Sequence, residues 1–311
     1  MTKTLTTLVP YTEYVQRLQK AGIPNPAQEV RLIMAHVLQM SEALLMQASP
    51  QSISSEDRLK LDAAMTARES RKPLERILEH IDFAGLRLRV GEAIYKPYRE
   101  TEDALTHAVA LFQDTKNPLR ILDLGTGSGC ILLALLDALP HATGVGIDNS
   151  PEALALAEEN AKANNLHNRA VFRQGHWSQD IEETFDLVIS NPPRVATADI
   201  ARLMPEMRQY DPVTALDGGE DGLRFFRWLA EDFKRLIKSN GIGFVQVGPR
   251  YALKIIEIFH QAGLTSLDVK TNFAGHPMAL VYRHKVSQQR GKLWFQEMLR
   301  FIRLKYTKIR E

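Results

Sequence analysis

Apolar residues recur at helical spacing through the first seventy residues of the chain. Residues 14–21 and 30–38 each place most of their apolar side chains on one face of a helix. Gly22 and two nearby prolines separate these helices, and Ser54 followed by Asp57 is typical of the start of a third. No cluster of chemically reactive side chains accompanies them. The pattern predicts a small helical bundle whose role is recognition of a partner.

The hydrophobic period changes between residues 74 and 95. Apolar and polar residues come close to alternating there, and Gly85 and Gly91 interrupt the pattern. This arrangement predicts a short β-hairpin that connects two domains.

From about residue 100 to 286 the chain alternates strands and helices. The predicted strands are residues 119–124, 143–148, 171–173, 185–190, 242–247, 267–270 and 278–284. The predicted helices are residues 130–138, 151–164, 223–237 and 251–262, and Asn240 and Gly241 are predicted to stop the third. Such alternation predicts a mostly parallel sheet with helices on both faces. The last two strands have no helix between them, which predicts one antiparallel edge.

Length and composition indicate which broad class of protein this chain belongs to. With 311 residues, 44% hydrophobic and 24% charged, the chain has the length of about two domains and the balance of a soluble globular protein. No window approaches the roughly 18 apolar residues of a spanning helix, and the first ten residues have no apolar core, so we expect neither a membrane span nor a secretory signal. A single cysteine, Cys130, allows no internal disulfide and no cysteine metal site, and we expect no metal. We therefore expect a reducing intracellular compartment, the cytoplasm or an organellar matrix.

Charge is nearly balanced over the whole chain but not at its end. The 39 Lys and Arg residues against 37 Asp and Glu give no overall attraction to nucleic acid or anionic membranes. Residues 288–311, however, hold seven Lys or Arg and two Glu, and Trp294, Met298 and Ile309 fall near one helical face. This basic tail predicts an amphipathic helix. This helix either stays solvated or docks on the protein itself, or it lies on RNA, the ribosome, lipid or an acidic partner protein.

A glycine-rich loop follows the strand at 119–124. Its sequence, from Asp123 to Gly129, is Asp-Leu-Gly-Thr-Gly-Ser-Gly. Gly125, Gly127 and Gly129 let a ligand approach the backbone closely. A dinucleotide fold needs Gly-x-Gly-x-x-Gly to receive a pyrophosphate, whereas the glycines here alternate. We therefore expect a nucleoside with a small charged tail rather than a dinucleotide.

Asp148 ends the next predicted strand, 19 residues after Gly129. An acid at this place can accept both ribose hydroxyls through its two carboxylate oxygens. The alternative is a cap for the helix that begins at Pro151, although Asn149 or Ser150 could also cap that helix. Together with the glycine loop, Asp148 favours S-adenosyl-L-methionine as the cofactor.

The strand at 185–190 runs into Asn191-Pro192-Pro193-Arg194. Two successive prolines fix the backbone and remove two N–H donors. The loop then presents two acceptors, the Asn191 side-chain oxygen and the Pro192 carbonyl oxygen, in a rigid frame. Two acceptors can hold both hydrogens of an –NH2 group, either of a carboxamide or of an exocyclic base amine. The alternative is that the two prolines only make a rigid turn and that the loop binds no ligand.

Taken together, these residues resemble the HemK/PrmC family, N(5)-glutamine methyltransferases that modify peptide chain release factors. The resemblance covers residues 10–285 and implies a class I methyltransferase fold, a doubly wound α/β sheet of seven strands with a small helical N-terminal domain. It implies a helical domain at 1–73 that helps dock the release factor, a hairpin linker at 74–99 and a methyltransferase domain at 100–287, with the tail at 288–311 outside the family pattern.

The resemblance also implies roles for individual residues. Those implied to line the cofactor site are Asp123, Gly125, Thr126, Gly127, Ser128, Gly129, Asp148, Trp177 and Asn191. Those implied to receive the glutamine side chain are Asn191, Pro192, Pro193 and Arg194, the first two acting directly on the amide.

Three positions depart from the family pattern. Arg194 stands where the family has an aromatic residue, His176 precedes Trp177 where the family has an acid, and residues 98–102 read Tyr-Arg-Glu-Thr-Glu in place of Arg-Pro-(Glu/Asp)-Thr-Glu. A guanidinium beside a sulfonium would repel it. We therefore expect Arg194 either to turn outward to an acidic partner or phosphate, or to pair with Glu100, Glu102 or another acid.

Three functions remain open at this point. One is a protein glutamine methyltransferase, which needs no general base because the site mainly aligns nitrogen, methyl carbon and sulfur. Another is a binding or assembly protein on a methyltransferase fold that has lost its chemistry. The third is a methyltransferase acting on nucleic acid or another amine. The balanced charge and the missing aromatic residue at 194 disfavour it.

Overall fold

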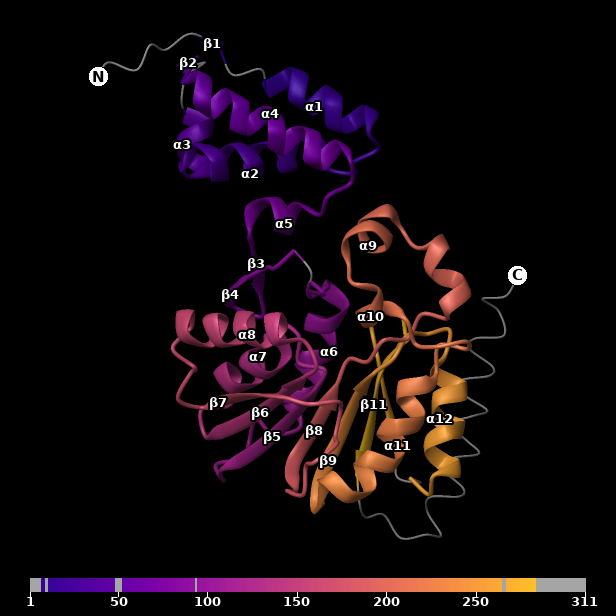
Figure 1. Cartoon of the computed structure of the whole chain (residues 1–311). Helices are drawn as coiled ribbons and strands as arrows, with labels where there is room; N and C mark the ends of the chain where they lie inside the picture. Colours follow the sequence, from indigo (N-terminus) through magenta and orange to yellow (C-terminus); the bar gives the residue numbers. More distant parts are fainter. Residues whose placement is uncertain (1–6, 9–10, 48–51, 93, 265–266, 284–311) are drawn as a thin grey trace. The chain divides into compact units, whose positions relative to one another are not determined.

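The computed structural model describes residues 7–8, 11–47, 52–92, 94–264 and 267–283. The chain divides into two compact units, which we call the helical unit and the α/β unit (Figure 1). The helical unit comprises residues 1–81 together with 203–210, and the α/β unit comprises residues 82–202 together with 211–311. The basic tail at 288–311 lies outside the described residues, so its helix and partners stay predictions.

The helical unit is built around one apolar core. Tyr14, Leu18 and Leu61 are fully buried in it. The Ser54 hydroxyl accepts a hydrogen bond from the backbone N–H of Asp57 at 3.0 Å, which confirms the predicted helix start. Its elements are β1 (Thr7–Leu8), α1 (Tyr11–Lys20), α2 (Pro26–Leu38), α3 (Glu42–Gln47), β2 (Ser52–Ile53), α4 (Ser55–Glu69), α5 (Leu74–Leu78) and α9 (Pro205–Tyr210), with β1 and β2 paired antiparallel.

Two strands pair where the sequence predicts a hairpin. They are β3 (His80–Phe83) and β4 (Leu86–Arg89), which form a two-stranded sheet. Ala84 and Gly85 between them both have positive φ, as two-residue hairpin turns require. The sequence pattern missed α5, which occupies the first part of the same segment.

The α/β unit contains a seven-stranded sheet in the order β10-β11-β9-β8-β5-β6-β7. Strands β9, β8, β5, β6 and β7 are parallel, while β11 runs antiparallel to β9 and to β10. The predicted doubly wound sheet and its antiparallel edge are therefore confirmed. The strands are β5 (Leu119–Leu124), β6 (Ala142–Asp148), β7 (Ala170–Gln174), β8 (Phe185–Ser190), β9 (Ile237–Gln246), β10 (Leu267–Thr271) and β11 (Pro277–Arg283).

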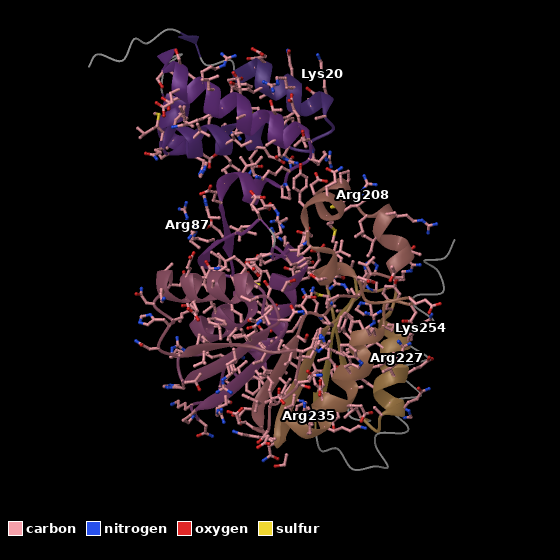
Figure 2. All side chains as sticks on the ribbon, in the orientation of Figure 1. Lys20, Arg87, Arg208, Arg227, Arg235 and Lys254 are labelled. Atoms are coloured by element: carbon pink, nitrogen blue, oxygen red, sulfur yellow. The ribbon has the colours of Figure 1, made fainter. Side chains whose placement is uncertain are left out.

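Helices cover this sheet and bury its apolar side chains (Figures 1 and 2). One core cluster joins Leu122, Val188 and Val245 of the strands to Phe226 of α11 and Ile255 of α12. No residue of α6, α7 or α8 belongs to this cluster, although these three helices also contact strands of the sheet. The helices are α6 (Arg99–Ala110), α7 (Cys130–Ala138), α8 (Pro151–Ala163), α10 (Val213–Leu216), α11 (Arg224–Leu236) and α12 (Ala252–Gln261), with a 3-10 turn η1 (Thr197–Arg202).

One predicted boundary is wrong. The helix predicted to run to Ile237 and stop at Asn240 and Gly241 ends at Leu236, and β9 begins at once and contains all three of those residues. The pairing of β8 with β9 shifts register after Phe185. A Cβ on Gly241 would lie 2.8 Å from the Phe185 carbonyl oxygen. The glycine therefore permits close backbone approach inside the sheet rather than ending a helix.

No helix among the described residues combines the length and hydropathy that a membrane crossing requires.

Candidate active site

A cavity of about 340 Å³ opens at the carboxyl ends of β5, β6 and β8, where ligands bind in open α/β sheets. Its size is within the range of small-molecule sites. All of its lining residues belong to the α/β unit. Among them are Gly125, Thr126, Gly127 and Ser128 of the glycine loop, Asp148 at the end of β6, His176 and Trp177 after β7, Asn191 and Pro193 after β8, and the run from Pro212 to Ala215 with Asp217.

The glycine loop is held against the neighbouring strand. The backbone N–H groups of Gly125 and Thr126 both donate to the Ile147 carbonyl oxygen at 2.9 Å. Gly127 has a φ of 55°, and a Cβ placed on it would meet nothing within 4 Å, so this residue leaves open space at the cavity wall. Gly129 does not line the cavity; it begins α7 with a φ of 78° and packs against α8 and β7.

Asp123 lies beneath the loop rather than in the cavity wall. It is fully buried, and one carboxylate oxygen accepts a hydrogen bond from the Thr126 hydroxyl at 2.7 Å. Burial raises the pKa of this carboxyl to about 7; the Thr126 hydrogen bond opposes the rise, and the Asp148 carboxylate adds to it. Asp123 is therefore placed to hold the loop in shape.

Asp148 is the last residue of β6 and lines the cavity. Its Oδ2 accepts from the Gly127 N–H at 2.8 Å, and its Oδ1 accepts from the Ser150 N–H at 3.0 Å. Each carboxylate oxygen can accept a second hydrogen bond, so both retain capacity for a ligand hydroxyl. The cap of α8 is Ser150, whose hydroxyl accepts from the Ala153 N–H at 3.1 Å. The alternative that Asp148 serves as that cap is therefore not needed.

An aromatic wall closes one side of the cavity. The Trp177 ring stacks on Phe225, with ring centroids 4.6 Å apart and planes inclined by 30°. Trp228 meets both rings edge-on. Arg235 of α11, labelled in Figure 2, donates to the Ile181 carbonyl oxygen at 2.6 Å and ties this helix to the segment after Trp177. Phe225 was not predicted as a site residue, because only the fold brings α11 beside Trp177.

Asn191 begins the loop after β8. Its Nδ2 donates to the Thr101 hydroxyl at 3.4 Å, and its Oδ1 accepts from Arg194 Nη1 at 2.7 Å. Pro193 lines the cavity, whereas Pro192 is buried and neither it nor Arg194 is among the lining residues.

The expectation that Arg194 turns outward or pairs with an acid is wrong. No acid among the described residues forms an ion pair with it, and its guanidinium reaches back to Asn191. The backbone of Arg194 is closely approached by two glycines. A Cβ on Gly218 would lie 2.9 Å from Arg194 Cα, and one on Gly222 would lie 2.7 Å from the Arg194 carbonyl oxygen. Gly218 and Gly222 therefore pack directly against the backbone of Arg194, where a larger residue would overlap with it.

The segment from Pro212 to Gly222 is the part of the site that sequence reasoning missed. It is joined to the loop after β8 by two hydrogen bonds, from the Val195 N–H to the Leu216 carbonyl at 2.9 Å and from the Gly218 N–H to the Val195 carbonyl at 2.8 Å. The sequence feature that could have indicated this loop is Asp217-Gly-Gly-Glu-Asp-Gly222, which has three glycines in six residues. Within the described residues, no group of three His, Cys, Asp or Glu side chains could hold a metal ion.

Comparisons with known proteins agree with this geometry. Residues 11–78 match the family model described as PrmC N-terminal domain, and residues 115–258 match the one described as methyltransferase domain. The hMettl16 catalytic domain, in complex with MAT2A 3'UTR hairpin 6, has a similar fold, with a TM-score of 0.54 at 16% identity over 76% of this chain and 84% of that one. The α/β unit therefore has the class I methyltransferase fold.

Two curated relatives carry the same name. The release factor glutamine methyltransferase of Rhodospirillum rubrum is 38% identical over 271 residues, which are 87% of this chain and 83% of that protein. The one of Agrobacterium fabrum is 36% identical over 86% of this chain and 94% of its own length. With this identity, this coverage and both domain matches, the chain belongs to the release factor glutamine methyltransferase family.

Proposed function

We propose that this protein transfers a methyl group from S-adenosyl-L-methionine to the side-chain amide nitrogen of a glutamine in a peptide chain release factor. The observation that supports this most directly is that Asp148 and Asn191 open onto one cavity. The first is suited to a nucleoside and the second to an amide. We also infer that the helical unit contributes to docking the release factor.

The residues present fit the cofactor. Asp148 keeps acceptor capacity for two ribose hydroxyls, since each of its oxygens makes one hydrogen bond to the backbone. The open space beside Gly127 lets a ligand lie against the loop. Trp177, backed by Phe225, offers an apolar aromatic surface to a flat base. When bound, the cofactor supplies an electrophilic methyl group on a sulfonium.

The methyl acceptor is a weak nucleophile, because the amide lone pair is delocalised into the carbonyl. A hydrogen bond from its –NH2 group to Asn191 Oδ1 would return electron density to nitrogen and orient the lone pair. Pro192 does not line the cavity, so its carbonyl oxygen could accept the second hydrogen only if the loop moves on binding. The two prolines hold Asn191 in a fixed frame, which lowers the entropy lost on alignment. The carbon–sulfur bond breaks as the carbon–nitrogen bond forms, and S-adenosyl-L-homocysteine leaves. The methylated nitrogen then carries a positive charge and is strongly acidic, so it loses its extra proton to water and no side chain is required as a general base.

The test is methyl transfer to a release factor domain that carries a Gly-Gly-Gln motif. With isotopically labelled S-adenosyl-L-methionine, mass spectrometry should locate one added methyl on that glutamine. Asn191→Ala should lower the rate at least about a hundredfold, or about 2.7 kcal/mol of barrier.

The matched control is Asn117→Ala, an exposed asparagine before β5, which should keep the native rate. An unmodified glutamine after prolonged incubation of the native protein, or equal rates in the two variants, would contradict the proposal.

A further inference from the structure

Trp177 has a backbone conformation that a bulky residue rarely adopts. Its φ is 58°, in the left-handed region, and Asp180 three residues later has a φ of 64°. This conformation is costly for a residue with a large side chain and persists only where the surrounding contacts fix it. The same residue lines the cavity, and its Cη2 lies 3.8 Å from the position of a Cβ on Gly125. A strained backbone therefore carries one wall of the candidate active site.

One face of α11 contacts both the ring of Trp177 and the chain that follows it. Phe225, Trp228, Asp232 and Arg235 are spaced three, four and three residues apart, so their side chains lie on one face of the helix. The two aromatic side chains pack on the Trp177 ring. The two charged side chains form hydrogen bonds with the segment just after Trp177. The same helix face therefore fixes the ring and the backbone that carries it.

The guanidinium of Arg235 bonds to the backbone and to a side chain of this segment. Its Nη1 donates to the Ile181 carbonyl oxygen at 2.6 Å. Its Nη2 donates to the Ser178 carbonyl oxygen at 2.7 Å and to the Ser178 hydroxyl at 2.6 Å. That hydroxyl donates in turn to Asp232, whose Oδ1 lies 3.1 Å from Arg235 Nη2. A planar guanidinium holds several acceptors in one geometry, so the chain after Trp177 is fixed in place.

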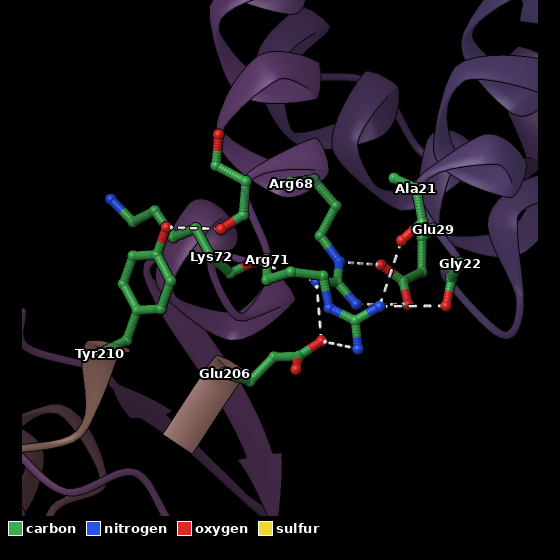
Figure 3. Close-up of polar contacts among 9 residues, drawn as sticks. Ala21, Gly22, Glu29, Arg68, Arg71, Lys72, Glu206 and Tyr210 are labelled. Carbon is green, nitrogen blue, oxygen red and sulfur yellow. Dashed lines mark hydrogen bonds and ion pairs between the residues drawn. The ribbon is translucent and has the colours of Figure 1, made fainter. Parts of the chain in front are cut away.

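A second charged network, in the helical unit, has no such link to the cavity wall. There, Glu206 Oε1 lies 2.7 Å from Arg71 Nη2 and 3.3 Å from Arg68 Nη1 (Figure 3). All three residues belong to the helical unit, and none of them lines the cavity. The network around Arg235 lies wholly in the α/β unit, and its member Ser178 directly follows a residue that lines the cavity.

Arg235 is distant from the cavity along α11. Ten residues separate it from Phe225, about 15 Å of helix, and it is not among the lining residues. We propose that Arg235 is a positioning residue for the cofactor, which holds Trp177 in its left-handed conformation so that the ring forms the wall that receives the base. The part of this inference that concerns cofactor binding rests on the proposed function. The part that concerns the hold on residues 177–181 does not.

The test compares Arg235→Gln with Arg169→Gln in the full chain. Arg169 is the matched control, because its guanidinium donates to the carbonyl oxygens of Leu139 and Ala142, both at 3.2 Å, and none of these three residues lines the cavity. Hydrogen exchange of the backbone amides from 177 to 181 should become at least fivefold faster in Arg235→Gln and stay unchanged in Arg169→Gln. The Kd for S-adenosyl-L-methionine, measured by calorimetry, should rise about tenfold in Arg235→Gln only.

A double variant tests whether Arg235 acts through Trp177. Trp177→Gly removes the ring and relieves the strain, and it should itself weaken cofactor binding. Adding Arg235→Gln to Trp177→Gly should change the Kd less than about twofold, because the group that Arg235 positions is already gone. Arg235→Lys keeps the charge but loses the planar set of donors, so it should fall between native and Gln. Circular dichroism checks that each variant is folded.

Three results would overturn the inference: unchanged exchange at 177–181, an equal change in Arg169→Gln, or a further tenfold loss of affinity in the Trp177→Gly background. If the native protein binds no S-adenosyl-L-methionine, the proposed function fails, and the exchange comparison still decides whether Arg235 holds the segment. If it binds the cofactor but methylates no release factor domain, the proposed acceptor is wrong, and the affinity comparison still decides the role of Arg235.

Discussion

Arg194 and Asn191 share one hydrogen bond at the point where the proposal places the substrate amide. Arg194 Nη1 donates to Asn191 Oδ1 at 2.7 Å, and no described acid neutralises the guanidinium. An oxygen that already accepts from a cation is a weaker acceptor for a second donor. A sulfonium nearby would also be repelled, by about 4 kcal/mol at 4 Å with an effective dielectric of 20. Arg194 is therefore expected to slow the reaction.

Replacing Arg194 by tyrosine should raise the rate of glutamine methylation at least tenfold, or about 1.4 kcal/mol of barrier. The change frees Asn191 Oδ1 and removes the charge. The measurement is the initial rate with the Gly-Gly-Gln domain, with Arg173→Tyr on the edge strand β7 as a control for the same exchange at a half-exposed site. If the native protein already turns over at an ordinary enzymatic rate and Arg194→Tyr is no faster, the repulsion argument fails.

The residues of the site differ in how far sequence alone could place them. Asp148 and Asn191 were predicted at the cavity because the first ends one strand of a parallel sheet and the second directly follows another, and the carboxyl ends of such strands share one edge. The direction of Arg194 was not predicted, since the pattern of residues does not show that its guanidinium reaches back to Asn191, three residues earlier. Phe225 was missed for the same kind of reason.

At the scale of elements, the loop from 216 to 222 supports the loop after β8. Gly222 has a φ of 75°, and its Cβ position lies 2.7 Å from a backbone carbonyl oxygen, which cannot rotate away as a side chain could. The contact therefore requires glycine both for its backbone conformation and for its size.

Gly222→Ala should lower the free energy of unfolding by about 2 kcal/mol or more, because strained φ and steric overlap add. Gly263→Ala is the matched control, since its φ is 85° but nothing lies within 4 Å of its Cβ position; it should lose only about 1 kcal/mol. Denaturant unfolding of both variants measures the difference. Equal losses would mean that the close approach at Gly222 costs nothing.

Elements with a regular apolar pattern were predicted well, and elements without one were not. Strands such as β5 and β8 are short, mostly apolar segments between turn signals, so their composition and length identify them. The short α9 has no buried residue and no apolar stripe, and charged contacts within the helical unit position it. Its sequence therefore carried no signal of where it packs.

At the scale of the whole molecule, the helical unit is not one continuous stretch of chain. The sequence pattern suggested a domain within residues 1–73, whereas the compact unit extends to 81 and includes 203–210. A discontinuous unit depends on contacts between distant segments, here Glu206 with Arg68 and Arg71. Period and composition describe only local sequence, so they could not reveal it.

The cavity is also a property of the whole α/β unit. Gly127, Asp148, Trp177 and Asn191 lie at or just after the carboxyl ends of four different strands, and only the sheet brings them together. The central claim is that this cavity holds S-adenosyl-L-methionine with its ribose on Asp148. Methyl transfer by this site requires that the cofactor binds there, whichever molecule accepts the methyl group.

Calorimetric titration with S-adenosyl-L-methionine tests this claim most directly. The native protein should bind one equivalent, and Asp148→Ala should bind about 10- to 150-fold more weakly, a loss of about 1.5–3 kcal/mol for hydrogen bonds to a charged group. Asp137→Ala, at an exposed aspartate of α7, should bind as the native protein does. No binding by the native protein, or unchanged affinity in Asp148→Ala, would contradict the account.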